Sequence, residues 1–109
     1  MFDSEEGYRL SIAPHRVEIV APSASGLFYA CQTLQALLVH DDQPSLSALQ
    51  IEDAPRFAYR GLLIDVARHF FSQQVLMRVV DEMSRLKLNA LHLHLTDDTG
   101  WRMPIPGFP

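Results

Sequence analysis

Two groups of polar residues, each placed at the end of an apolar stretch, are the features of this sequence that suggest chemistry. Arg68 follows one apolar run closely, and His94 and Asp97 close a second one. An arginine at the end of a strand presents a rigid fork of donors that can hold vicinal hydroxyl groups or a carboxylate. The same residues also fit a purely structural ion pair, either Asp65–Arg68 or Arg68–Asp97. The sequence leaves both interpretations open.

The two histidines of the second run raise the question of a metal. His92 and His94 are two residues apart, so on a strand they share one face. Such a pair has real metal-binding geometry, and with an aspartate it would suit a metal-dependent hydrolase. Only two candidate ligands are aligned, however, and neutral histidines also fit a polar layer inside a protein. We therefore expect no metal and no cofactor, and keep the metal-dependent TIM-barrel hydrolase as an alternative.

Other polar or aromatic residues are weaker candidates. Asp97 and Asp98 are adjacent, so on extended backbone one would face a pocket while the other holds the loop. Trp101 would either stack on a sugar ring or cap the rim of a barrel. Asp81 and Glu82 form an acidic pair, but they lie in the middle of a predicted helix on its solvated side. We assign that pair no catalytic role.

The elements that must position these residues follow from hydrophobic periodicity. Residues 61–66 and 88–95 predict buried strands, and residues 72–86 predict an amphipathic helix between them. This order predicts a parallel pair joined by a crossover. Parallel strands end at the same edge, where an α/β barrel builds its active site. We therefore expect Arg68 and Asp97 to lie within about one side-chain length of each other.

The predicted helix over residues 72–86 has further features. Ser72 is its expected cap, and Asp81 has the spacing to pair with Arg85. The apolar stripe expected to be buried consists of Val75, Leu76, Val79, Val80, Met83 and Leu86.

The N-terminal half predicts a different organisation, with alternating strands around one helix. Ser23 or Ser25 is the expected cap of that helix. Cys31 falls on its apolar face, so we expect a small core residue there. The expected segments are strands at 8–12 and 16–20, a helix at 25–38, a polar loop at 40–45 and a short strand at 46–51. The expected apolar face of the helix consists of Leu27, Phe28, Cys31, Leu34 and Leu38.

Composition narrows the possible partners. The net charge is −4 and the basic residues are scattered, so we expect no nucleic acid partner. No apolar run approaches the roughly 18 residues of a membrane span. The N-terminal residues are acidic and lack the apolar core of a signal peptide, which leaves the compartment open. No glycine-rich phosphate-binding motif occurs, so nucleotide binding has no support.

Together these motifs resemble a known family. Stretches of the second half resemble the start of the catalytic barrel of family 20 glycoside hydrolases, the β-N-acetylhexosaminidases: residues 60–70, 87–89, 92–98 and 100–102. Residues 7–10, 26–29 and 32–34 resemble the end of the small α+β domain that precedes that barrel. Leu93 departs from the pattern, because the family often has an aromatic residue there.

The resemblance implies an α/β fold in two parts. Residues 1–54 would be the C-terminal part of the α+β accessory domain, and residues 55–109 the first βαβ unit of a (β/α)8 TIM barrel. It also implies that Arg68 holds hydroxyl groups of a terminal N-acetylhexosamine. Asp97 would belong to the polar network of the same pocket, and His94 would support it.

In the family the acetamido group of the substrate attacks the anomeric carbon, with help from an adjacent Asp-Glu pair on a later strand. That pair and the aromatic residues around the acetamido group have no matching position in this sequence.

We therefore expect an N-terminal part of a β-N-acetylhexosaminidase that is inactive alone. The parent enzyme would hydrolyse terminal, non-reducing N-acetylglucosamine or N-acetylgalactosamine from glycans or chitin fragments, by substrate-assisted retaining catalysis. With two of the barrel's strands, the chain would expose strand edges, so we expect self-association. A non-catalytic packing or interaction module is the remaining alternative.

Overall fold

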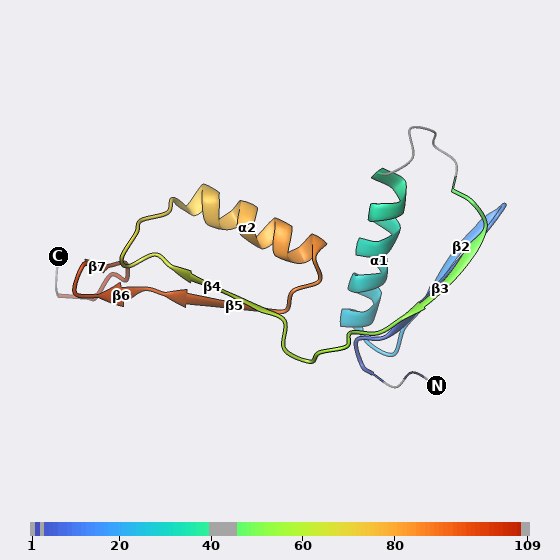
Figure 1. The fold of residues 1–109 in the computed structure, drawn as a ribbon, viewed down its shortest axis with the longest axis horizontal. Coiled ribbons are helices and arrows are strands. Elements are labelled where there is room, and N and C mark those ends of the chain that lie inside the picture. Colours follow the sequence, from blue (N-terminus) through green and yellow to red (C-terminus); the bar gives the residue numbers. More distant parts are fainter. Residues whose placement is uncertain (1, 3, 40–45, 108–109) are drawn as a thin grey trace. The chain divides into compact units, whose positions relative to one another are not determined.

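The fold is that of a computed structural model, drawn in Figure 1, which describes residues 2, 4–39 and 46–107. The polar loop expected at residues 40–45 lies outside the described residues. The chain divides into two units, Met1–Ala58 and Tyr59–Pro109, and each has its own sheet and helix.

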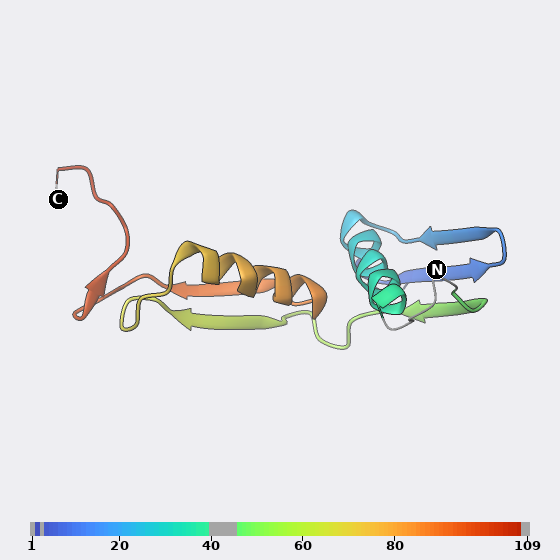
Figure 2. The ribbon, with the colours of Figure 1, turned by 90° about the horizontal axis from the view of Figure 1, so that it is seen from above.

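The first unit is a three-stranded antiparallel sheet with a helix on one face. Its strands are β1 (Tyr8–Ala13), β2 (Arg16–Val20) and β3 (Leu49–Asp53), in the order β2-β1-β3. Helix α1 (Ala24–Val39) lies over this sheet, as seen from above in Figure 2. The strands and the helix predicted for this half are thus confirmed, with shifts of a few residues at their ends.

The core of the first unit depends on the alternation in β1. Tyr8, Leu10 and Ile12 point to the same face and are buried against Tyr29 and Ala30 of α1. This strand therefore supplies three of the five buried residues in the core cluster of the unit, among the residues that the structure describes.

Helix α1 shows one success and one error of the sequence prediction. Ser23 is the cap, because its Oγ accepts the Gly26 N–H at 3.2 Å. Cys31, however, is exposed, so its expected core role is wrong. The helix packs through the neighbouring face that carries Ala30, and this face also includes Tyr29, Leu34 and Leu37.

The second unit contains the predicted parallel strand pair. Strands β4 (Gly61–Asp65) and β5 (Ala90–His94) are parallel and are connected through helix α2 (Gln73–Arg85). Gly61 lies opposite Ala90, and Asp65 lies opposite His94. Figure 2 shows α2 running along the two strands. A short hairpin of β6 (Thr96–Asp97) and β7 (Gly100–Trp101) follows.

The ends of α2 explain why β5 is shorter than predicted. Ser72 caps the helix as expected, by accepting a backbone N–H of the first turn. Lys87 adopts a left-handed conformation with φ 57°, which ends the helix. The Leu88 N–H still bonds to the Met83 carbonyl at 2.9 Å. The strand therefore begins at Ala90, after the predicted start at residue 88.

Only part of the apolar stripe of α2 is buried. Met83 is buried and Leu76 and Val79 are half-buried, whereas Val75, Val80 and Leu86 are exposed. The physical reason is width, because two strands cover a narrower strip than the apolar face of the helix.

Arg85 pairs with Glu82 at 3.1 Å, and the expected pair with Asp81 is wrong.

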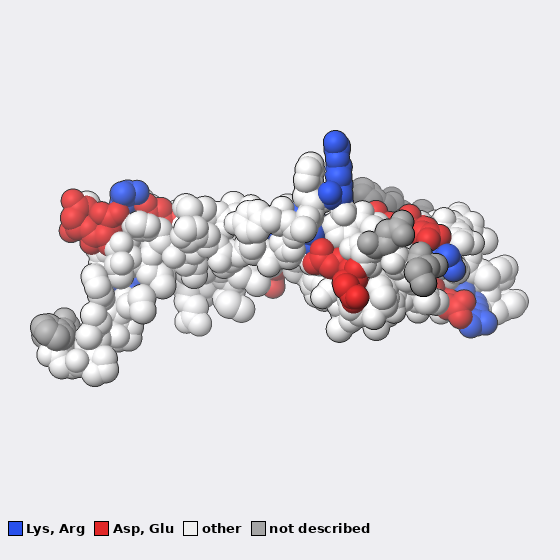
Figure 3. All heavy atoms as spheres, turned by 90° about the horizontal axis from the view of Figure 1, so that it is seen from below, with Lys and Arg blue, Asp and Glu red and all other residues white. Residues whose placement is uncertain are grey.

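Charged side chains are scattered over the face of the molecule that Figure 3 draws. In Figure 3 the Lys and Arg atoms occur in small separate groups, several of them beside Asp or Glu. Within the described part of the chain, no helix is long and apolar enough to cross a membrane.

The exposed apolar side chains of the second unit predict that the 109-residue chain self-associates. Leu63 of β4 is 57% exposed and Leu86 is 69% exposed. Apolar surface of this kind usually marks an interface, and unpaired strand edges favour association further. We expect sedimentation velocity to show oligomers at micromolar concentration, and Leu63→Lys to raise the monomer fraction severalfold.

Val17→Lys in β2 is the matched control, since Val17 is exposed to a similar degree in the first unit. It should leave the monomer fraction unchanged. A clean monomer with a sharp melt well above about 50 °C would contradict this prediction.

Candidate functional site

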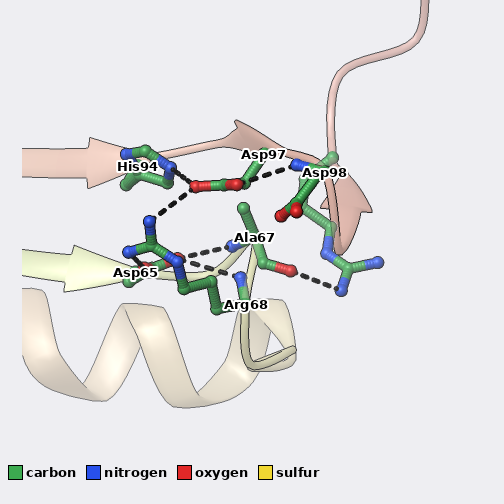
Figure 4. A network of polar contacts seen from close by, with 7 residues as sticks. Asp65, Ala67, Arg68, His94, Asp97 and Asp98 are labelled. Carbon is green, nitrogen blue, oxygen red and sulfur yellow. Dashed lines mark hydrogen bonds and ion pairs between the residues drawn. The ribbon is translucent and has the colours of Figure 1, made fainter.

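The polar side chains of the second unit meet at one edge of the β4–β5 pair. Asp65 is the last residue of β4 and His94 the last residue of β5, and the two are direct partners in the parallel register. Arg68 follows β4 in a turn, and Asp97 lies in β6 just beyond β5. Figure 4 shows these four side chains converging from the two strands.

Ion pairs and a hydrogen bond join these four side chains into one network. Arg68 Nη1 lies 2.8 Å from Asp65 Oδ2, and Arg68 Nη2 lies 2.9 Å from Asp97 Oδ2. His94 Nε2 lies 2.9 Å from the same Asp97 oxygen. The predicted proximity of Arg68 and Asp97 is confirmed. Both ion pairs that the sequence offered as alternatives are present at the same time.

Asp65 also fixes the turn that carries Arg68. Its Oδ1 accepts the Ala67 N–H at 3.1 Å and the Arg68 N–H at 2.9 Å. The His94 carbonyl accepts the N–H groups of Val66 and Ala67, both at 3.2 Å. The sequence predicts Asp65 only as an ion-pair partner of Arg68. The available signal was an aspartate directly before a turn, where its side chain commonly accepts backbone N–H groups.

Asp98 supports Asp97 through the backbone. The Asp98 N–H donates to Asp97 Oδ1 at 2.8 Å. The expectation that these neighbours alternate on a strand is wrong, because Asp98 lies in the turn between β6 and β7. Asp97 therefore has both carboxylate oxygens engaged, one by backbone and one by side chains.

The remaining candidates lie outside this network. His92 is exposed on β5, and among the described residues no hydrogen bond or ion pair joins it to His94 or Asp97. Trp101 is exposed, and its indole N–H donates to the Met103 carbonyl at 2.6 Å. Within the described ranges, no three His, Cys, Asp or Glu side chains gather as metal ligands would.

The network favours ionised carboxylates. Hydrogen bonding with Asp98, through its side chain and its backbone N–H, lowers the pKa of Asp97 to about 2, with further contributions from His94 and the Arg68 charge. The pKa of Asp65 is also lowered, first by the hydrogen bond from the Arg68 backbone N–H and then by its guanidinium. The guanidinium thus lies between two carboxylates that stay charged at neutral pH.

A carbon-detected NMR titration of the Asp97 carboxyl group should give a midpoint near pH 2, well below its ordinary value of 3.8. Because the pKa is lower in the folded chain, the ionised Asp97 stabilises the fold above about pH 4. This contribution disappears as the pH falls towards 2. Arg68→Gln should raise the midpoint, because the variant removes the positive charge beside Asp97.

Arg16→Gln is the control for this titration. It removes an arginine that pairs with Glu18 in the first unit, so it should leave the Asp97 midpoint unchanged. A midpoint near 3.8 in the unaltered chain would contradict the hydrogen-bonded arrangement.

Comparison with known families covers both units. The profile described as "Glycosyl hydrolase family 20, domain 2" matches residues 3–54. The profile described as "Glycosyl hydrolase family 20, catalytic domain" matches residues 57–109.

Individual relatives agree over nearly the whole chain. The β-N-acetylhexosaminidase of Cellulomonas fimi is 49% identical over 107 residues, which are 96% of this chain and 22% of that protein. The N,N'-diacetylchitobiase of Vibrio harveyi is 47% identical over 102 residues, which are 94% of this chain and 12% of that protein. The chain therefore spans less than a quarter of the length of these relatives.

Solved structures of similar proteins also match nearly the whole chain. The exo-β-N-acetylglucosaminidase of Vibrio harveyi in complex with N-acetylglucosamine superposes with a TM-score of 0.87 at 40% identity, over 97% of this chain and 17% of that one. The N-acetyl-β-hexosaminidase of Streptomyces plicatus gives a TM-score of 0.83 at 45% identity, over 96% of this chain and 23% of that one. On these matches, the chain belongs to glycosyl hydrolase family 20.

Proposed function

We propose that these 109 residues are part of a β-N-acetylhexosaminidase that removes terminal, non-reducing N-acetylglucosamine or N-acetylgalactosamine. Residues 1–54 would belong to the α+β accessory domain and residues 55–109 to the start of a TIM barrel. The family match and the relatives named for this activity support the proposal. The parallel β4–β5 pair also suits a barrel, where active sites lie at the C-terminal ends of the strands.

The observation that carries the proposal is the exposed guanidinium between two fixed carboxylates. The Arg68 side chain is 64% exposed, whereas its partners Asp65 and Asp97 are 25% and 20% exposed. Among the described residues, carboxylates engage one N–H of each terminal nitrogen of the guanidinium, which leaves other N–H groups to donate to a ligand. The arginine is therefore held in position by its partners and open on its outer side.

This arrangement suits the binding of sugar hydroxyl groups. Neutral hydroxyls gain from a charged donor, and a guanidinium can donate to two neighbouring oxygens at once. Asp97 keeps the guanidinium oriented, and His94 bonds to the same Asp97 oxygen. In the proposed enzyme, Arg68 contacts the sugar directly, while Asp97 and His94 belong to the polar network of the same subsite.

The bond-breaking groups would come from elsewhere in the enzyme. In substrate-assisted catalysis the acetamido oxygen bonds to the anomeric carbon as the glycosidic bond breaks, and a general acid protonates the departing oxygen. Asp81 and Glu82, the adjacent Asp-Glu pair of the described residues, are exposed on α2. Nothing favours them for this role.

No specific observation favours the alternatives. A metal-dependent hydrolase would need His92, His94 and a third ligand gathered in one place, and the described residues form no such group of three. A packing module needs no exposed, pre-oriented arginine at the strand ends. The proposed sugar subsite accounts for this arginine.

The role of Arg68 can be tested in a chimera that carries residues 1–109 in place of the matched segment of the Cellulomonas fimi enzyme. Arg68→Ala should lower kcat/KM for 4-nitrophenyl N-acetyl-β-D-glucosaminide about 100-fold, or about 3 kcal/mol of transition-state binding. The physical reason is the loss of a charged donor to sugar hydroxyls. Steady-state kinetics measures the effect.

Arg85→Ala is the control, since Arg85 forms an exposed ion pair with Glu82 on α2. It should change kcat/KM by less than about twofold. An unchanged kcat/KM in the Arg68→Ala chimera, or a folded chimera without activity, would contradict the proposed function.

The 109-residue chain by itself should not hydrolyse the same substrate. The catalytic Asp-Glu pair of the family has no matching position in this sequence, and general acid–base help is typically worth about 10²–10⁴-fold. The release of nitrophenol should equal that of a buffer blank. Turnover that follows the chain through repeated purification would show that the chain carries its own catalytic acid.

A further inference from the structure

We propose that Arg102 is a positioning residue, which fixes the turn of residues 66–68 so that Arg68 is presented to the sugar in one orientation. This inference rests on the proposed function, because it assigns Arg102 a part in the same site. In the sequence, Arg102 belongs to the family-like stretch 100–102, and nothing in the sequence predicts a chemical role for it.

The contacts of Arg102 are directed at backbone carbonyls. Its Nε–H donates to the Val66 carbonyl at 2.8 Å, and its Nη2 donates to the Ala67 carbonyl at 3.2 Å. No carboxylate pairs with Arg102 within the described part of the chain. An arginine kept for charge balance would face an aspartate or glutamate. This one uses its fork to hold two consecutive peptide groups.

Those two peptide groups are the ones that precede Arg68, and they are held from both sides. Asp65 and the His94 carbonyl accept the N–H groups of the turn, and Arg102 binds its carbonyls. Val66 is 3% exposed and Ala67 is 0% exposed, so water has little access to this backbone. Buried carbonyls need partners, and Arg102 supplies one for each.

The neighbourhood of Arg102 permits this approach. A Cβ at position 100 would clash with the Ala67 carbonyl oxygen and would lie 2.8 Å from Arg102 Nη2. Only glycine therefore lets the β6–β7 hairpin come so close to the turn. The Arg102 guanidinium also lies over the Phe70 ring at 5.3 Å. The backbone N–H of Arg102 donates to the Leu95 carbonyl at 2.9 Å.

A fixed turn matters because the orientation of Arg68 depends on it. Arg68 is largely exposed, and a long exposed side chain loses considerable rotamer freedom when it binds a ligand. With the backbone clamped, its two carboxylate partners can define one rotamer before the sugar arrives. Without the clamp, the turn would sample other conformations, and the guanidinium would match the sugar hydroxyls only part of the time.

A double-mutant cycle in the chimera with the Cellulomonas fimi enzyme tests this inference. Arg102→Gln should lower kcat/KM about tenfold, while the same change in the Arg68→Ala background should cost less than about twofold. Arg102→Lys keeps the charge, but a point charge cannot hold both carbonyls, so it should restore only part of the activity. A residue that merely stabilises the fold would cost the same in both backgrounds.

The matched control is Arg60→Gln, at the other end of the same strands. Arg60 also donates its Nε–H to a backbone carbonyl, that of Lys87 at 2.8 Å. It should lower the melting temperature without changing kcat/KM at temperatures well below the transition.

As a second measurement, Arg102→Gln in the 109-residue chain should accelerate amide hydrogen exchange at Arg68 at least severalfold, with the β4–β5 amides unaffected.

Several results would overturn the inference. These are equal losses from Arg102→Gln in the two backgrounds, no loss from Arg102→Gln, full recovery with Arg102→Lys, or unchanged exchange at Arg68. If Arg68→Ala alone had no effect on kcat/KM, the proposed function itself would fail. That outcome is distinguishable from a failure confined to Arg102.

Discussion

The parallel register of β4 and β5 is the constraint on which the site depends. It places Asp65 directly opposite His94, so the last residues of both strands arrive at one edge. At this edge, hydrogen bonds join the two strand ends to each other. The His94 carbonyl accepts two N–H groups of the turn after β4, and the His94 side chain reaches Asp97 beyond β5. A shift of one residue would turn each side chain to the opposite face and separate the network.

The sequence predicts the strands correctly where the apolar residues follow a single clear pattern. The alternation of β1 and the apolar runs of β4 and β5 gave the strands, and the polar residues after each run gave the site edge. The prediction of the buried face was wrong where two faces of a helix are both apolar. On α1 the residues 27–38 offer apolar side chains almost all round, so periodicity selected a face with Cys31, whereas packing on β1 selected the face with Ala30. The start of β5 was misplaced because nothing in the residue types marks Lys87 as left-handed.

The site could be predicted in its charged members but not in its backbone support. Arg68, His94 and Asp97 are residue types that suggest chemistry, and strand order brings them together. Arg102 meets Val66 and Ala67 across more than 30 positions of sequence, and its partners are carbonyl groups that every residue carries. Residue types therefore cannot predict contacts of this kind. Only the closeness required at Gly100 hints at them, and this too emerges only from the three-dimensional arrangement.

The Asp65 carboxylate makes two sets of contacts, and together they determine how long the side chain at this position can be. Its Oδ1 accepts two backbone N–H groups of the following turn while its Oδ2 holds the Arg68 guanidinium. Both tasks require the carboxylate to stand one methylene from the backbone. Glutamate carries the same charge, but its extra methylene would place the oxygens beyond the N–H groups of the turn, so charge alone does not satisfy this position. Aspartate and glutamate carry the same charge, but only aspartate has the side-chain length that position 65 requires.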